Sequence, residues 1–167
     1  MAAVLRAALA LVDESQRQKT RPDFTRLRAM LFYIDEFPEK HHHRKESELL
    51  FPALRARTPL SRHLLERLDD DHACAEHNIR SVEHALAAFE FLGEPRRAEF
   101  EEAMARYADF YMMHMAVEET EVFPLAEQAL IDEDWQQLDE AFSHQAESGV
   151  EQEERLCFAA LLARISG

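Results

Sequence analysis

Glycine, proline and cysteine are scarce in this chain. Its 167 residues include 3 glycines, 6 prolines and 2 cysteines. The shortage of glycine and proline argues against low-complexity disorder and is typical of a chain that is mostly helical. Cys74 and Cys157 have no C-x-x-C spacing. They are therefore interpreted as free thiols in a reducing compartment, which predicts a cytoplasmic protein.

Long apolar runs and an excess of positive charge are also absent. No stretch approaches the roughly 18 apolar residues of a membrane span. Lysine and arginine number 19 against 33 aspartates and glutamates, so the formal net charge is −14. This charge repels nucleic-acid phosphates and anionic lipids. The sequence therefore predicts neither nucleic acid nor a membrane as a partner.

Apolar residues recur at steps of three and four along most of the chain. This spacing predicts helices at about 4–12, 22–57, 61–91, 97–129, 132–142 and 152–165. No segment shows the alternation of a β-strand. The expected fold class is all-α, an up-down four-helix bundle. Residues 1–130 are predicted to form the bundle and residues 131–167 a short C-terminal helical extension packed on it, in a single domain overall.

Two of the predicted helices carry the same pattern of histidine, glutamate and Phe-Pro. Residues 42–52 are HHRKESELLFP and residues 114–124 are HMAVEETEVFP. A third helix has His72 and Glu76 at the same spacing. Residues four apart lie about 40° apart around a helix axis, so each pair projects from one face. Each pair can therefore hold one ion.

The paired side chains are candidate metal ligands: His42, Glu46, His72, Glu76, His114 and Glu118. Each pair is expected on the apolar face of its helix, as where His114 follows Phe110 at four residues. A buried glutamate is costly unless a charge or a metal neutralises it. Imidazole and carboxylate together suit iron, manganese or zinc. Glu119, five residues after His114, is an alternative to Glu118.

The remaining histidines and the methionines are given less specific roles. His43 is interpreted either as a surface group or as one that orients a ligand. His77 and His84 lie on a different helix face from His72. The methionines at positions 112, 113 and 115 are predicted to belong to the core rather than to a soft-metal site.

These segments resemble the hemerythrin-like family with the HHE cation-binding domain. The resemblance lies in residues 37–52, in Asp71-His72 and in residues 114–124, and the tail is similar to the extension of bacterial members. It implies a four-helix bundle with a non-haem di-iron centre. The positions that match the family's ligands are His42, Glu46, His72, His114 and Glu118. Glu76 stands where some relatives have a second ligand on the third helix, often a histidine.

The sequence departs from the family pattern in the first helix. The family takes a histidine there, whereas this chain has no histidine before His41. Either the true start of the protein lies upstream of Met1, or the protein lacks this ligand. A missing ligand would leave one metal under-coordinated and lower the affinity of that site. A single ion, or zinc, is therefore the alternative to two irons.

The resemblance implies a protein that binds or senses dioxygen or related small oxidants, with iron as its cofactor, rather than an enzyme. A di-iron enzyme that decomposes peroxide and an iron-storage or structural metal bundle are the alternatives. The expected partner is dioxygen or a similar small ligand, and a homodimer is left open.

Overall fold

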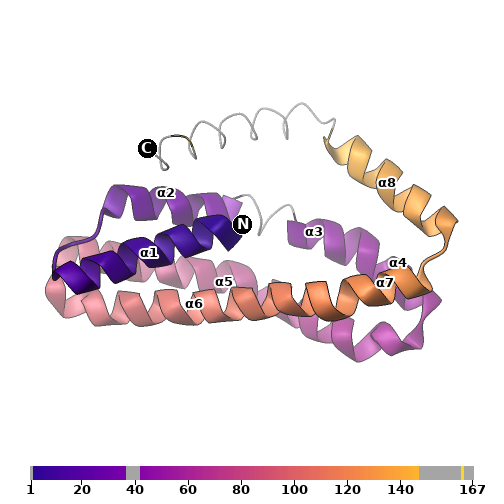
Figure 1. The fold of residues 1–167 in the computed structure, drawn as a ribbon, viewed down its shortest axis with the longest axis horizontal. Coiled ribbons are helices and arrows are strands. Elements are labelled where there is room, and N and C mark those ends of the chain that lie inside the picture. The colour runs from indigo at the N-terminus through magenta and orange to yellow at the C-terminus, as the bar shows by residue number, and fades with distance from the viewer. Residues whose placement is uncertain (1, 37–41, 147–162, 164–167) are drawn as a thin grey trace. The chain divides into compact units, whose positions relative to one another are not determined.

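The computed structural model describes residues 2–36, 42–146 and 163, without the side chains of residues 142–146. Every regular element in this part of the chain is helical, which confirms the all-α prediction (Figure 1). The up-down order of four helices stays a prediction. The predicted last helix at 152–165 lies almost entirely outside the described residues. Each described helix is too short or too polar to cross a membrane.

The α-helices are α1 (Ala2–Gln18), α2 (Phe24–Ile34), α3 (His43–Lys45), α4 (Phe51–Arg57), α5 (Arg62–Leu92), α6 (Arg97–Val117), α7 (Phe123–Ala129) and α8 (Asp132–Ala146). The π-helical segments include η2 (Glu46–Leu50) and η5 (Glu118–Val122). Two 3-10 turns are η3 (Pro59–Ser61) and η4 (Glu94–Arg96). The chain divides into two compact units, residues 1–40 with 74–113, and residues 41–73 with 114–167.

The first unit contains α1, α2, the part of α5 from residue 74 onward, and the part of α6 up to residue 113. Phe89 of α5 lies at the centre of an aromatic group, with its ring 5.1 Å from that of Phe24 and 6.0 Å from that of Phe100. Asp23 begins α2 by accepting a hydrogen bond from the backbone N–H of Arg26 at 3.0 Å. Side chains of four helices thus supply one apolar core. The prediction that the three methionines belong to the core is wrong for Met112 and Met113, which are 37% and 62% exposed.

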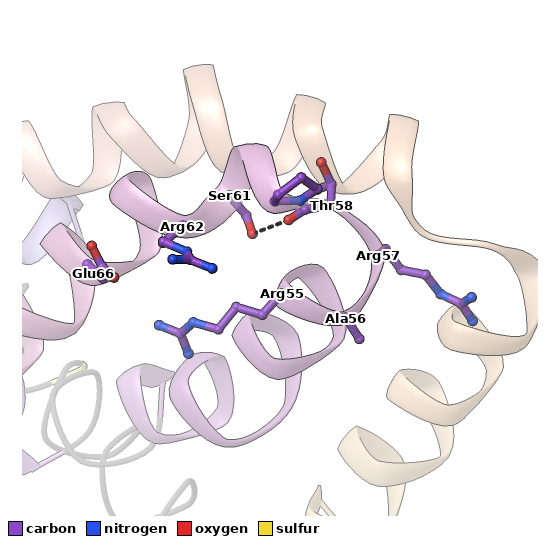
Figure 2. Close-up of a pocket in the computed structure, with 8 residues that line it drawn as sticks. Arg55, Ala56, Arg57, Thr58, Ser61, Arg62 and Glu66 are labelled. Atoms are coloured by element: carbon purple, nitrogen blue, oxygen red, sulfur yellow. Dashed lines mark hydrogen bonds between the residues drawn. The ribbon is translucent and has the colours of Figure 1, made fainter.

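The second unit contains α3, η2, α4, η3, the start of α5, the end of α6, η5, α7 and α8. Figure 2 shows the turn between α4 and α5, where the Ser61 hydroxyl donates to the Thr58 carbonyl at 2.9 Å. The Thr58 side chain accepts from the backbone N–H of Leu60 at 3.2 Å. These bonds satisfy backbone groups that the helix ends leave unpaired.

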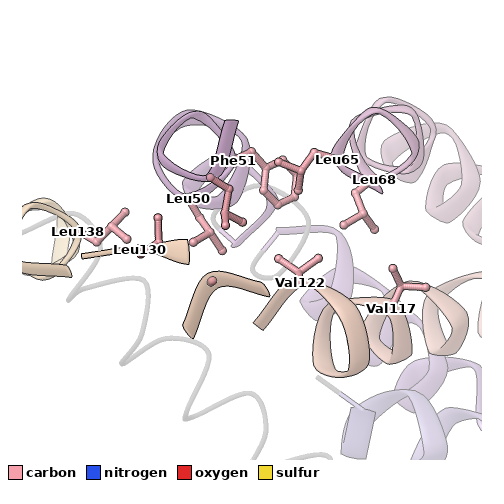
Figure 3. Close-up of a cluster of buried hydrophobic side chains, with 10 residues drawn as sticks. Leu50, Phe51, Leu65, Leu68, Val117, Val122, Leu130 and Leu138 are labelled. Carbon is pink, nitrogen blue, oxygen red and sulfur yellow. The ribbon is translucent and has the colours of Figure 1, made fainter. Parts of the chain in front are cut away.

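An apolar cluster forms the core of the second unit (Figure 3). Its buried members are Leu50, Phe51, Leu54, Leu65, Leu68, Val117, Val122, Ala126, Leu130 and Leu138. Leu138 and Asp134 both belong to α8. Arg57 of α4 forms two hydrogen bonds of 2.6 and 2.8 Å with Asp134. Helix α8 is therefore joined to this unit by both packing and charge. The domain boundary at residue 130 stays a prediction.

Candidate metal centre

The two repeated sequence segments fold in the same unusual way. Each contains a π-helical turn that begins at a glutamate, Glu46 in η2 and Glu118 in η5. The backbone N–H of Phe51 donates to the Glu46 carbonyl, and that of Phe123 donates to the Glu118 carbonyl, five residues back. Proline at 52 and 124 has no N–H and clashes with a carbonyl four residues back, so we attribute the wider turn to it.

Glu46, His72, His114 and Glu118 converge in the second unit. Each offers one ligand atom, and these four atoms lie within 4.8 Å of one another. His114 Nε2 lies 2.9 Å from Glu118 Oε1, and His72 Nε2 lies 3.5 Å from Glu46 Oε2. The two Nε2 atoms are 3.3 Å apart. We call these four residues the His/Glu cluster.

The outer nitrogens of both imidazoles have side-chain partners. The Ser47 hydroxyl lies 2.9 Å from His72 Nδ1, and an Asp71 carboxylate oxygen lies 3.4 Å from His114 Nδ1. When Nδ1 of a neutral imidazole carries the proton, Nε2 presents its lone pair. Partners of this kind orient metal-binding histidines and raise their basicity. Ser47 and Asp71 therefore turn both Nε2 atoms toward the cluster.

The cluster fits a cation in three physical respects. Two glutamate side chains, each 5% exposed, lie beside each other and the imidazoles, although burying a charge is costly unless it is neutralised. Oε2 of Glu46 is buried and accepts no hydrogen bond from the described residues. Imidazole nitrogen with carboxylate oxygen is a donor set that iron, manganese and zinc accept.

His42 and His43 lie beside this cluster in different environments. The Nε2 atom of His42 lies 3.3 Å from Glu46 Oε1 and 3.9 Å from Glu118 Oε2, and the side chain is 50% exposed. His43 is 5% exposed, stacks on His72 with ring centroids 4.1 Å apart, and could share an ion with His72 and His114. The sequence allows either a surface or an orienting role for His43, and its burial rules out the surface role. Its position three before Glu46 and seven before Leu50, on one helix face, is the sequence signal for its burial.

Glu76 is the predicted ligand whose side chain does not face the interior. Its side chain is 59% exposed and forms an ion pair with Arg80, so the expectation of an inward-facing Glu76 is wrong. The buried line of α5 runs through Leu68, Ala75 and Ile79, with His72, 8% exposed, on the same line. Position 76 falls beside this line, where water solvates the carboxylate.

The choice between the two adjacent glutamates of η5 favours Glu118. Glu118 is buried and belongs to the cluster, whereas Glu119 is exposed. The side chains of His77 and His84 are also exposed, as their different helix face predicts. Burial therefore distinguishes Glu118 from Glu119 as the candidate ligand, whereas the sequence pattern alone allows either.

The two cluster carboxylates have opposite pKa shifts. Burial raises the pKa of Glu46 from 4.5 to about 7, and the nearby Glu118 carboxylate adds to the rise. Burial works to raise the pKa of Glu118 as well, but contacts from His114 and His42 hold that pKa below its usual range. Without a metal, the pair therefore tends to hold one proton, on Glu46.

The cluster imidazoles also differ from each other. Burial lowers the pKa of His72 to about 4, with a further contribution from the neighbouring His114. Burial works to lower the pKa of His114 too, but hydrogen bonding and charge from Glu118 outweigh it, so this pKa is raised. His72 is consequently neutral at pH 7 and available as a ligand.

Metal binding is expected to weaken as the pH falls below about 7. A metal must displace the proton of Glu46, so the apparent affinity should fall about tenfold per pH unit between about pH 7 and 5. Protonation of His114 adds to the loss, because its raised pKa extends its charged form to higher pH. Competition titrations against a chelator of known pH dependence measure the slope. An affinity that stays constant over this range would contradict the assigned proton.

The regular elements of the described residues are all helical, and the second unit gathers two imidazoles and two buried carboxylates. The protein is therefore a helical protein with a His/Glu site suited to a cation. The model of the hemerythrin HHE cation binding domain matches residues 1–126 of the 167. The chain therefore belongs to the hemerythrin HHE cation-binding domain family. Comparisons with curated proteins and with solved structures gave no match.

Proposed function

We propose that this protein holds iron in the His/Glu cluster and uses it to bind or sense dioxygen or a related small oxidant. The observation that carries the proposal is the convergence of His72 and His114 Nε2 with two buried carboxylates, each of which has a buried oxygen that accepts no hydrogen bond from the described residues. Membership of a cation-binding family supports it independently. Bound ferrous iron would supply the affinity for dioxygen, and the chain would supply the ligands and their burial.

The residues of the chain have distinct roles in this proposal. His72 and His114 bind through Nε2, while Ser47 and Asp71 fix their rings from the other side. Glu46 and Glu118 supply negative charge. His42 supplies a further nitrogen at the exposed edge of the cluster, and His43 is the alternative donor. The ligands proposed here are thus the predicted ones apart from Glu76, whose side chain is exposed.

The number of ions depends on how these donors are shared. The groups His43/His72/His114 and Glu46/His72/His114/Glu118 have both imidazoles in common. Two irons are proposed from the family, and one ion or zinc is the alternative. Elemental analysis of the full chain purified from its own host counts the metal per chain and separates these cases.

Oxygen binding is tested by exposing reduced, iron-loaded protein to dioxygen. We expect a change in visible absorption that reverses when the oxygen is removed. Zinc-loaded protein is the control, because zinc has no redox chemistry and should show no change. Peroxide consumption without reversible oxygen binding would instead favour the peroxide-decomposing enzyme. Metal uptake with neither response would favour the storage or structural role.

A further inference from the structure

A second site lies in the pocket at the turn between α4 and α5 (Figure 2). Its volume is about 340 Å³, and no member of the His/Glu cluster lines it. The lining residues are Arg55, Ala56, Arg57, Thr58, Pro59, Ser61, Arg62 and Glu66. Three arginines and one glutamate are among the lining residues, in a chain whose formal net charge is −14. The pocket is therefore a local concentration of positive charge.

The three arginines differ in how far their charge is already matched. Arg57 forms a two-point contact with Asp134 at 2.6 and 2.8 Å. Arg55 contacts Asp69 through a single nitrogen, Nη2. Arg62 has no ion pair or hydrogen bond with any other described side chain. Since a guanidinium carries five N–H donors, Arg55 and Arg62 keep most of theirs available.

The directions of the side chains separate the arginines in the same way. Figure 2 shows the guanidinium groups of Arg55 and Arg62 extending into the same space, while Arg57 points away toward α8. Glu66 lies at the edge, is 60% exposed, and pairs with His63 at 3.4 Å. Two neighbouring guanidinium groups repel each other, and an anion between them would turn that repulsion into attraction.

We propose that this pocket binds a small free oxyanion of the phosphate class between Arg55 and Arg62. Planar guanidinium groups match a tetrahedral oxyanion well, because each can donate two parallel hydrogen bonds to two of its oxygens. The Thr58 hydroxyl lies at the same turn and lines the pocket. The site does not depend on the metal proposed above.

The test is a titration of the full chain with inorganic phosphate, at constant ionic strength, by calorimetry or amide chemical shifts. We expect saturable binding of one phosphate per chain, with shifts at residues 55–66. Arg62→Gln should weaken the binding at least about tenfold, because it removes a charge-assisted contact. Arg67→Gln, an equal change of charge at another exposed position of α5, should leave it within about twofold.

Three outcomes would overturn the proposal. One is the absence of saturable binding. Another is equal weakening in Arg62→Gln and Arg67→Gln, which would indicate only the general field of the protein. The third is binding that survives Arg62→Gln and disappears when the metal is removed, which would place the phosphate on the metal. Circular dichroism of each variant checks that the helices are retained.

Discussion

Glu118→Gln is expected to weaken metal binding at least about 100-fold. Glu118 is buried, lies 2.9 Å from His114 Nε2, and keeps its negative charge because of its histidine neighbours. Glutamine has nearly the same volume but no charge, so the cluster loses an anionic ligand without a change in packing. Changes to groups that merely support metal ligands cost about 10- to 100-fold, and the loss of a ligand should exceed that. Chelator competition measures the affinity directly.

Glu119→Gln is the matched control. It removes the same charge one residue further along η5, from an exposed side chain outside the cluster. Its affinity should stay within about twofold of the parent, because exposed substitutions away from a site have small effects. Equal losses in both variants would show that Glu118 acts through the overall charge of the helix. A dominant loss in Glu119→Gln would reverse the assignment of the ligand.

Phe51→Ala is expected to lower the free energy of unfolding by about 3–5 kcal/mol, the usual effect of removing a buried phenylalanine ring. The Phe51 ring is fully buried in the apolar cluster of the second unit and stacks on His72 with centroids 5.5 Å apart and an interplanar angle of 12°. Its loss therefore leaves a cavity against a cluster imidazole. Thermal and urea unfolding should show the change, with a melting temperature lower by about 6–20 °C.

Phe123→Ala provides the comparison at the equivalent position of the repeat. Phe123 also precedes a proline and follows a π-helical turn, yet its side chain is 42% exposed. Removing it should lower the free energy of unfolding by less than about 1.5 kcal/mol, because a partly exposed ring buries less apolar surface when the chain folds. Similar losses in the two variants would show that the repeat, and not burial, decides the contribution of the ring.

Much of the candidate site could be predicted from local spacing. Histidine and glutamate four residues apart on an apolar face placed His114 and Glu118 correctly in the interior. The same rule failed at Glu76, which is exposed. A step of four residues turns about 40° beyond a full turn of the helix. After His72, the buried face of α5 continues three residues on, at Ala75, and not four residues on, at Glu76. Spacing finds a face, but the width of that face depends on the neighbouring helices.

The π-helical turns η2 and η5 change the spacing of side chains around the helices that contain them. Each adds a residue to one turn just before a proline, so positions beyond it rotate relative to a continuous α-helix. The Phe-Pro pairs are visible in the sequence, but a kink and a widened turn are both consistent with proline. The sequence also does not predict that His42 is exposed and His43 is buried. The two residues are adjacent histidines, and the rest of the fold decides which of them is covered.

The sequence by itself determined the helical class, the repeated His and Glu positions and the membership of a cation-binding family, because these depend on periodicity, composition and motif. Only the tertiary structure decided which of these side chains meet. It joined Glu46, His72, His114 and Glu118, brought His43 beside them and left Glu76 in water. The physical reason is that pairing and desolvation depend on contacts between helices that are distant in the chain, which no local pattern contains.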